Sequence, residues 1–154
     1  MLPATASRVE NATSEEFNRR VASEIEESVR YHAEHPGQIG RRLEELDREW
    51  DIERTLEANA ATLALTGTLL GAFVDRRFLV LPAVVTGFLL QHALQGWCPP
   101  VPVFRRLGVR TTAEIDRERY ALKALRGDFG RYDAISASAD PRRQAEAALK
   151  AAAT

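Results

Sequence analysis

The residue with the clearest chemical potential is a single cysteine at the end of a long apolar segment. Cys98 lies in the stretch GWCPPVPVF, residues 96–104. A reactive thiol needs a pKa lowered by a nearby cation or helix N-terminus, and Arg105 and Arg106 follow the prolines. Cys98 instead follows a predicted helix C-terminus, where the helix dipole disfavours a thiolate. The sequence therefore favours a small buried residue at the helix end over a redox or sulfur-handling thiol.

The histidines are the second set of candidates. His92 lies inside the apolar segment, where an ionisable side chain could transfer a proton or bind a metal. No carboxylate or second histidine lies near it in the sequence, which favours a neutral imidazole hydrogen-bonded to Asn59 or Thr62. His32 and His35 are spaced i, i+3, but a metal site needs a further ligand. We therefore predict no metal site.

Composition narrows the classes of function. The 154 residues carry 21 Lys and Arg against 22 Asp and Glu, so no basic excess indicates a nucleic-acid partner. One cysteine excludes an intrachain disulfide and a four-cysteine zinc site. No phosphate-binding glycine loop, HExxH motif or serine elbow occurs. We predict a protein without catalytic residues or a cofactor.

The uncharged residues are concentrated in the middle of the chain. Residues 58–74 form a run of 17 without formal charge, DRR follows at 75–77, and residues 78–104 form a run of 27. As helices, 58–74 would span about 26 Å and 78–97 about 30 Å, against a hydrocarbon core of about 30 Å. This pattern predicts a two-helix transmembrane hairpin over 58–104. The alternative is a buried helix pair in a soluble bundle, because both runs contain Asn, Thr or Gln.

Small residues recur at the spacing of helix–helix contacts in membranes. The six are Ala60, Ala64, Gly67 and Gly71 in the first run and Ala83 and Gly87 in the second. Lipid is as apolar as leucine, so membrane helices associate through the close backbone approach that small residues permit. Counting from the turn, we expect Gly71 to lie near Leu81 and Gly67 near Val85.

Arginine positions predict the orientation of the hairpin. Nine flanking arginines contrast with Arg76 and Arg77 in the turn: Arg41, Arg42, Arg48, Arg54, Arg105, Arg106, Arg110, Arg117 and Arg119. The positive-inside rule then places both termini in the cytoplasm. Trp97 is expected at the membrane interface, with Arg105 and Arg106 among the cytoplasmic headgroups.

The flanking segments have helical periodicity, and no stretch alternates long enough to predict a strand. We expect a flexible N-terminus over 1–12, amphipathic cytoplasmic helices over 13–57, and a further cytoplasmic helix over 105–129. Residues 130–154 are expected to form a flexible or alanine-rich helical tail. The predicted fold class is all-α.

The segments LDREWDIERTLEANAA and LQGWCPPVPVFRRLGVRTTAEI, together with the paired apolar runs, resemble the YgaP-like inner-membrane domain, a bacterial family of unknown function. The resemblance covers about residues 47–112. The positions matching its Gly-x-Cys-Pro and Leu-Gly pattern are Gly96, Cys98, Pro99, Leu107 and Gly108. It implies a hairpin in the bacterial inner membrane. Sulfur transfer belongs to a rhodanese domain that this chain lacks, so no activity is implied.

These observations predict a small, multi-pass, non-enzymatic membrane protein. Its partners would be the lipid bilayer and, through the cytoplasmic helices, a second copy or another protein. Two alternatives remain open at this stage: a membrane redox or sulfur-handling accessory that uses Cys98, and a soluble helical bundle.

Overall fold

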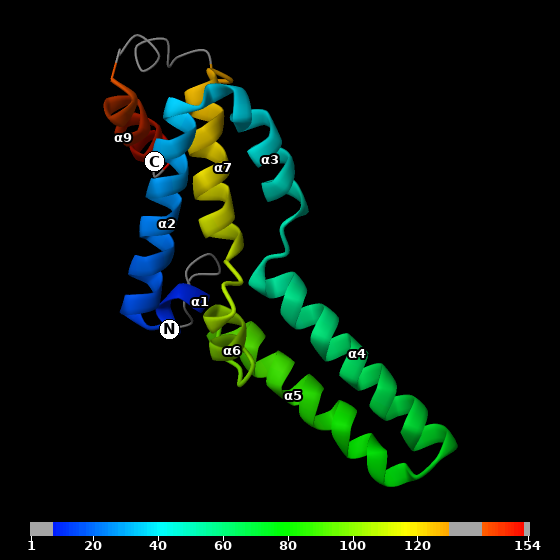
Figure 1. The fold of residues 1–154 in the computed structure, drawn as a ribbon. Coiled ribbons are helices and arrows are strands. Elements are labelled where there is room, and N and C mark those ends of the chain that lie inside the picture. Colours follow the sequence, from blue (N-terminus) through cyan, green and yellow to red (C-terminus); the bar gives the residue numbers. More distant parts are fainter. Residues whose placement is uncertain (1–7, 130–139, 153–154) are drawn as a thin grey trace. The chain divides into compact units, whose positions relative to one another are not determined.

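A computed structural model describes residues 8–129 and 140–152 (Figure 1). All regular elements in these ranges are helices, which confirms the all-α class. The chain forms two compact units, each made of two separate stretches of sequence. They are the hairpin unit, residues 1–14 and 50–111, and the bundle unit, residues 15–49 and 112–154.

The hairpin unit is built around two long antiparallel helices (Figure 1). Its elements are α1 (Arg8–Asn11), α4 (Ile52–Phe73), the 3₁₀ helix η2 (Arg76–Leu79), α5 (Val80–Gln95) and α6 (Val101–Arg106). Asp51 caps α4 by accepting a hydrogen bond from the Arg54 amide at 2.7 Å. At the turn, the Asp75 carboxylate accepts from the Arg77 amide at 2.8 Å. The sequence thus correctly predicted where the first helix stops, although α4 begins at Ile52 rather than Ala58.

A small apolar core holds the base of the hairpin, the end away from the turn. Its buried members are Val9, Ile52, Leu56, Cys98 and Val101. The Ile52 amide also donates to the Arg110 carbonyl at 2.9 Å, which joins the start of α4 to the segment after α6. The flexible N-terminus expected over 1–12 is therefore wrong for residues 8–11, which form α1 and bury Val9 against this core.

Two glycines form the close contact between α4 and α5. A Cβ atom on Gly67 would lie 2.6 Å from Pro82 Cδ and 3.0 Å from Leu81 Cβ, and one on Gly71 would lie 2.5 Å from Leu79 Cδ2. The expected neighbours, Val85 for Gly67 and Leu81 for Gly71, were wrong by two to four residues. After the turn the chain first forms η2, whose 3₁₀ geometry rises about 2.0 Å per residue, whereas an α-helix rises about 1.5 Å. The chain therefore needs fewer residues after the turn to come level with a given residue of α4.

The small residues of α5 do not share this contact. Ala83 and Gly87 are exposed, and no atom lies within 4 Å of where a Gly87 Cβ would be. Leu81 and Pro82 face α4, and Gly87 lies about 120–140° around the helix from them at 3.6 residues per turn. The predicted packing role of Ala83 and Gly87 is therefore wrong, whereas Ala60 and Ala64 are half-buried.

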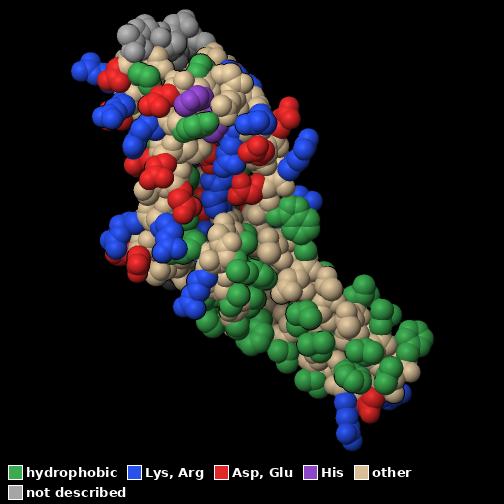
Figure 2. Space-filling model, in the orientation of Figure 1, with side chains coloured by type: hydrophobic (Ala, Val, Ile, Leu, Met, Phe, Trp, Pro, Cys, Tyr) green, Lys and Arg blue, Asp and Glu red, His purple; other side chains and the backbone are tan. Residues whose placement is uncertain are grey.

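The bundle unit buries large apolar side chains in a core of its own. Its elements are α2 (Glu15–Glu34), the 3₁₀ helix η1 (Pro36–Gln38), α3 (Ile39–Arg48), α7 (Thr112–Arg126) and α9 (Pro141–Ala152). Its buried core contains Val21, Ile25, Val29, Leu43, Leu46 and Leu122, and many charged side chains lie on the face that Figure 2 shows. Residues 130–154 were expected to form a flexible or an alanine-rich helical tail. Within them, Pro141–Ala152 form helix α9, whose Ala145 and Ala148 are buried. Residues 130–139 lie outside the described residues.

One carboxylate lies fully inside the bundle unit. Glu118 of α7 is 0% exposed, and it accepts hydrogen bonds from Ser28 at 2.6 Å and from Arg42 at 2.8 and 3.2 Å. A buried carboxylate is costly unless such partners satisfy it. Glu118 therefore joins α7 to α2 through a hydrogen bond and to α3 through an ion pair.

Candidate functional site

Three ionisable side chains meet at the base of the hairpin, each from a different helix. The Glu53 carboxylate of α4 lies 2.9 Å from His92 Nε2 of α5 and 2.9 Å from Arg8 Nη2 of α1. Arg8 Nη1 also donates to the Ala93 carbonyl at 3.1 Å. We call these residues, Arg8, Glu53 and His92, the basal cluster. One carboxylate thus holds α1, α4 and α5 together.

Local structure explains how the basal cluster forms. Glu53 lies in the first turn of α4 and His92 in the last turn of α5, and antiparallel helices bring those two ends together. Gly96 ends α5 in the left-handed conformation, at φ 73°. A Cβ there would lie 2.5 Å from the Arg8 carbonyl oxygen, so only glycine fits both the conformation and the close approach of α1.

The sequence did not indicate that Glu53 bonds to His92, nor that Arg8 bonds to Glu53. Asn59 and Thr62 were the expected partners, but Thr62 Oγ1 donates to the Ala58 carbonyl of its own helix at 2.7 Å, and Asn59 is exposed. Glu53 is 39 residues from His92 in sequence, so only the pairing of the helices brings them together. The signal available in the sequence was the position of Glu53, shortly before the uncharged run that begins at Ala58. An antiparallel second helix brings its last turn, which contains His92, back to that end of the first helix.

Electrostatics favour an ionised carboxylate at this site. Burial acts to raise the pKa of Glu53, but hydrogen bonds from Arg8 and His92 outweigh it, and the pKa lies below its ordinary value of 4.5. An ionised carboxylate can only accept hydrogen bonds, so Nε2 of His92 carries a proton. His92 is 2% exposed, and its Nδ1 is buried without a hydrogen-bond partner among the described residues. The imidazole is therefore oriented by Glu53 and enclosed.

Cys98 lies between α5 and α6 as a member of the basal apolar core. It is 4% exposed, which agrees with the small buried residue favoured by the sequence. Burial raises the pKa of the Cys98 thiol, and the backbone hydrogen bond from Val101 only partly offsets this. Both properties oppose the thiolate that redox or sulfur chemistry requires.

The residues expected at the membrane interface differ in exposure. Trp97 is 40% exposed and Arg106 is exposed, as an interfacial position requires. Arg105 is only 1% exposed, and its Nη1 donates to the Val109 carbonyl at 3.1 Å. The expectation that Arg105 meets headgroups is therefore wrong, because α6 turns this side chain inward to bind the backbone after it.

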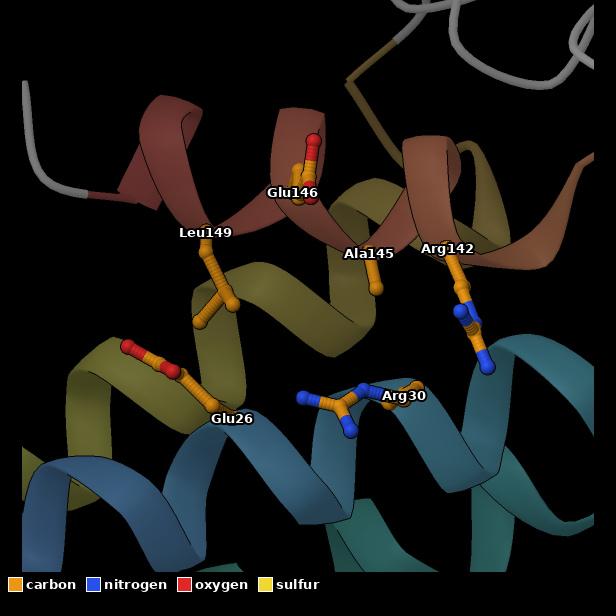
Figure 3. Close-up of a pocket in the computed structure, with 6 residues that line it drawn as sticks. All are labelled: Glu26, Arg30, Arg142, Ala145, Glu146 and Leu149. Carbon is orange, nitrogen blue, oxygen red and sulfur yellow. The ribbon is translucent and has the colours of Figure 1, made fainter.

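The bundle unit contains a hollow between α2 and α9, shown in Figure 3. Arg30 and Glu26 line it from α2, and Arg142 and Glu146 from α9, with Ala145 and Leu149 on the α9 side. All four charged residues are exposed, and the two signs balance. This is the composition of solvated helix faces, so the hollow indicates no particular chemistry.

The other two histidines bond to their own helix. His32 Nδ1 lies 2.7 Å from the Ser28 carbonyl, and His35 Nδ1 lies 2.9 Å from the Tyr31 carbonyl. No group of three or more His, Cys, Asp or Glu side chains within the described residues could hold a metal ion. His32 is buried and His35 exposed, so the pair does not share one solvated face.

Comparison with known proteins gives no relative from which a role could be transferred. No family model, curated protein or solved structure matches the chain.

Proposed function

We propose that this chain is a small integral protein of the bacterial inner membrane, inserted through the α4–α5 hairpin. The observation that carries the proposal is the exposed apolar surface of that hairpin (Figure 2). The large apolar residues exposed along it are Leu63, Leu65, Leu69, Phe73, Val74, Phe78, Leu79, Val80, Val84, Phe88, Leu90 and Leu94. Phe73 is 83% exposed, and Leu65 and Leu90 are each 62% exposed.

The contrast between the two units supports a lipid environment for the hairpin. Among the described residues, the bundle unit buries most of its leucines and isoleucines, whereas the buried residues of α4 beyond its first two turns are Gly67 and Gly71. Glycines inside and leucines outside are typical of helices that pack in lipid. In water this arrangement would be costly, since burying one such side chain fully is worth about 1.5–3 kcal/mol.

Helix length gives further support. Among the described residues, one helical segment, Arg76–Gln95, has the length and composition of a membrane span, with a mean hydropathy of 1.5. Only 6% of its apolar window is buried, whereas a core helix of a soluble protein is mostly buried. We propose that α4 accompanies it from Ala58 to Phe73, held by the glycine contact, so that the hairpin crosses the bilayer twice.

The orientation follows from the arginines. Arg76 and Arg77 lie exposed at the tip with Asp75, and nine arginines flank the hairpin in the sequence. We propose that both termini and the bundle unit are cytoplasmic. The charged outside of the bundle unit would then bind a protein partner or a second copy. This is a role in anchoring and interaction, without catalysis or a cofactor, and it fits the YgaP-like resemblance.

A redox or sulfur-handling role for Cys98 is the second candidate, since the thiol would lie at the membrane surface. The burial of Cys98 and its raised pKa weigh against it. The third candidate, a soluble bundle, would have to cover the exposed apolar surface of the hairpin by association. Both alternatives make predictions that differ from those of the anchor.

Fractionation tests the proposal directly. We expect the chain to sediment with membranes, to resist extraction by alkaline carbonate, and to be released by detergent. The double substitution of Leu65→Lys and Leu69→Lys should move it to the soluble or aggregated fraction, since each lysine costs about 2.5–3.5 kcal/mol near a helix centre in the bilayer. Ser23→Lys, on an exposed position of α2, is the matched control and should not change the fractionation. Recovery of the unmodified chain in the soluble fraction without detergent would refute membrane insertion.

A further inference from the structure

The two helices of the hairpin are in close contact at Gly67 and Gly71. Closer to the base, Leu56 and Leu63 of α4 and Leu89 of α5 line a space between the helices. An apolar cavity of about 120 Å³ remains there, bounded by Leu56, Asn59 and Leu63 of α4, Phe88 and Leu89 of α5, and Cys98. The whole cavity belongs to the hairpin unit.

The walls of this cavity select an apolar occupant. Leucine, valine and phenylalanine side chains form most of it, and neither Glu53 nor His92 lines it. Polar cavities recruit water, whereas apolar cavities of this kind stay dry, and one of about 150 Å³ binds benzene or xenon. A cavity of 120 Å³ therefore accommodates a small apolar group or several methylene units of a chain.

One polar side chain lies at the edge of the cavity. Asn59 is exposed and lines the cavity, and its amide forms no hydrogen bond with any described residue. An amide has two donors and an acceptor, so it can donate a hydrogen bond to a lipid ester carbonyl. In the proposed insertion, Asn59 lies at the boundary between headgroups and acyl chains, because it is the second residue of the uncharged run that begins at Ala58.

We propose that the cavity binds one membrane lipid, with part of an acyl chain between α4 and α5 and the ester group hydrogen-bonded to Asn59. The inference rests on the proposed membrane insertion, since the bilayer supplies the ligand. Leu63 and Phe88 are 39% and 40% exposed, so the cavity is reached from the outer surface that would face the acyl chains. The ligand class is a glycerolipid of the cytoplasmic leaflet.

Photolabelling of the full chain tests this site. The chain is reconstituted in vesicles of phosphatidylethanolamine and phosphatidylglycerol that contain a phospholipid with a diazirine in its acyl chain. Light-induced adducts are mapped by mass spectrometry. We expect adducts at Leu63, Phe88 and Leu89 in excess over those at outward residues such as Leu65. Ala60→Phe fills the cavity, and Ala61→Phe places the same ring on an exposed position one residue away that does not line it.

The expected result is a loss of cavity adducts of roughly tenfold in Ala60→Phe, equivalent to about 1.4 kcal/mol, with no loss in Ala61→Phe. Val85→Phe fills the cavity from α5 and replaces Ala60→Phe if that variant does not fold. Uniform adducts around the hairpin, or cavity adducts unchanged by either filling variant, would overturn the proposal. Cavity adducts that disappear as the protein-to-lipid ratio rises would show a second copy as occupant, which also overturns it. Failure of the chain to enter vesicles would refute membrane insertion itself.

Discussion

Gly67 and Gly87 allow the same substitution, glycine to alanine, to be compared at a close helix contact and at an open helix surface. Both lie inside long helices of the hairpin, and alanine should favour each helix over glycine by about 0.8–1.0 kcal/mol. At Gly67 the new Cβ would lie 2.6 Å from Pro82 Cδ, an atom of a ring that cannot rotate away, and 3.0 Å from Leu81 Cβ. At Gly87 it would meet nothing within 4 Å.

The expected magnitudes follow from these distances. Overpacking costs about 1–3 kcal/mol, so Gly67→Ala should lower the free energy of unfolding by up to about 2 kcal/mol after the gain in helix propensity. Gly87→Ala should raise it by up to about 1 kcal/mol. Because the propensity gain cancels between the two variants, their difference isolates the cost of separating α4 from α5. Gly67→Leu should be worse than Gly67→Ala.

The assay is unfolding of the purified chain in mild detergent by added dodecyl sulfate, followed by far-ultraviolet circular dichroism. Leu69→Ala serves as a further control, since Leu69 is 48% exposed and contributes little to the contact. Equal stability of Gly67→Ala and Gly87→Ala, within about 0.5 kcal/mol, would refute the glycine contact. If Gly87→Ala were less stable than the unmodified chain, the face of α5 that contains Gly87 would have to contact another molecule.

Three further predictions concern the tip and base of the hairpin. A cysteine at position 75, introduced as Asp75→Cys with Cys98→Ser, should react with an impermeant maleimide in intact cells; reaction only after lysis would reverse the topology. Since the pKa of Glu53 is lowered on folding, its stabilisation is complete above pH 4.5 and is lost as pH falls through the lowered pKa. Glu53→Gln should therefore lose less stability than the unmodified chain between about pH 5 and 3, measured by thermal unfolding, and parallel losses would contradict the Arg8–Glu53 ion pair. Cys98 should alkylate at neutral pH at least about tenfold more slowly in the folded chain than in the unfolded one, because burial raises its pKa. Faster alkylation would favour the redox alternative.

Much of the fold was readable from the sequence because it depends on local patterns. The absence of charge over 58–74 and the DRR turn predicted the end of the first helix correctly, and α4 ends at Phe73. The helical periodicity of residues 13–57 predicted amphipathic helices, and α2 buries Val21, Ile25 and Val29 on one face. Periodicity and turn residues act over a few positions, so a single sequence contains the information.

The arrangement of the base was not readable because it depends on helix register. Asn59 or Thr62 was expected to bond to His92, but its partner is Glu53, which lies closer to the start of α4. Part of the error arises in the turn, where extended and 3₁₀ residues advance farther than α-helical ones. α1 adds a second difficulty, since a four-residue helix has almost no periodic signal, yet it supplies Arg8.

The basal cluster and the glycine contact have complementary roles in the hairpin. In the proposed membrane hairpin, apolar side chains gain little by packing against one another, so the glycine contact would bring α4 and α5 together through close backbone approach. The basal cluster lies just before the uncharged run, where an ion pair is partly hydrated and Arg8 joins α1 to both helix ends. Removing the glycine contact should therefore separate the helices along their length, whereas removing Glu53 should release α1 from the base and leave the helix contact intact. The first change should appear as loss of resistance to dodecyl sulfate, and the second as faster proteolysis near Arg8 at unchanged resistance. If Glu53→Gln lowers both properties together, the two contacts form one cooperative unit, and this division of roles is wrong.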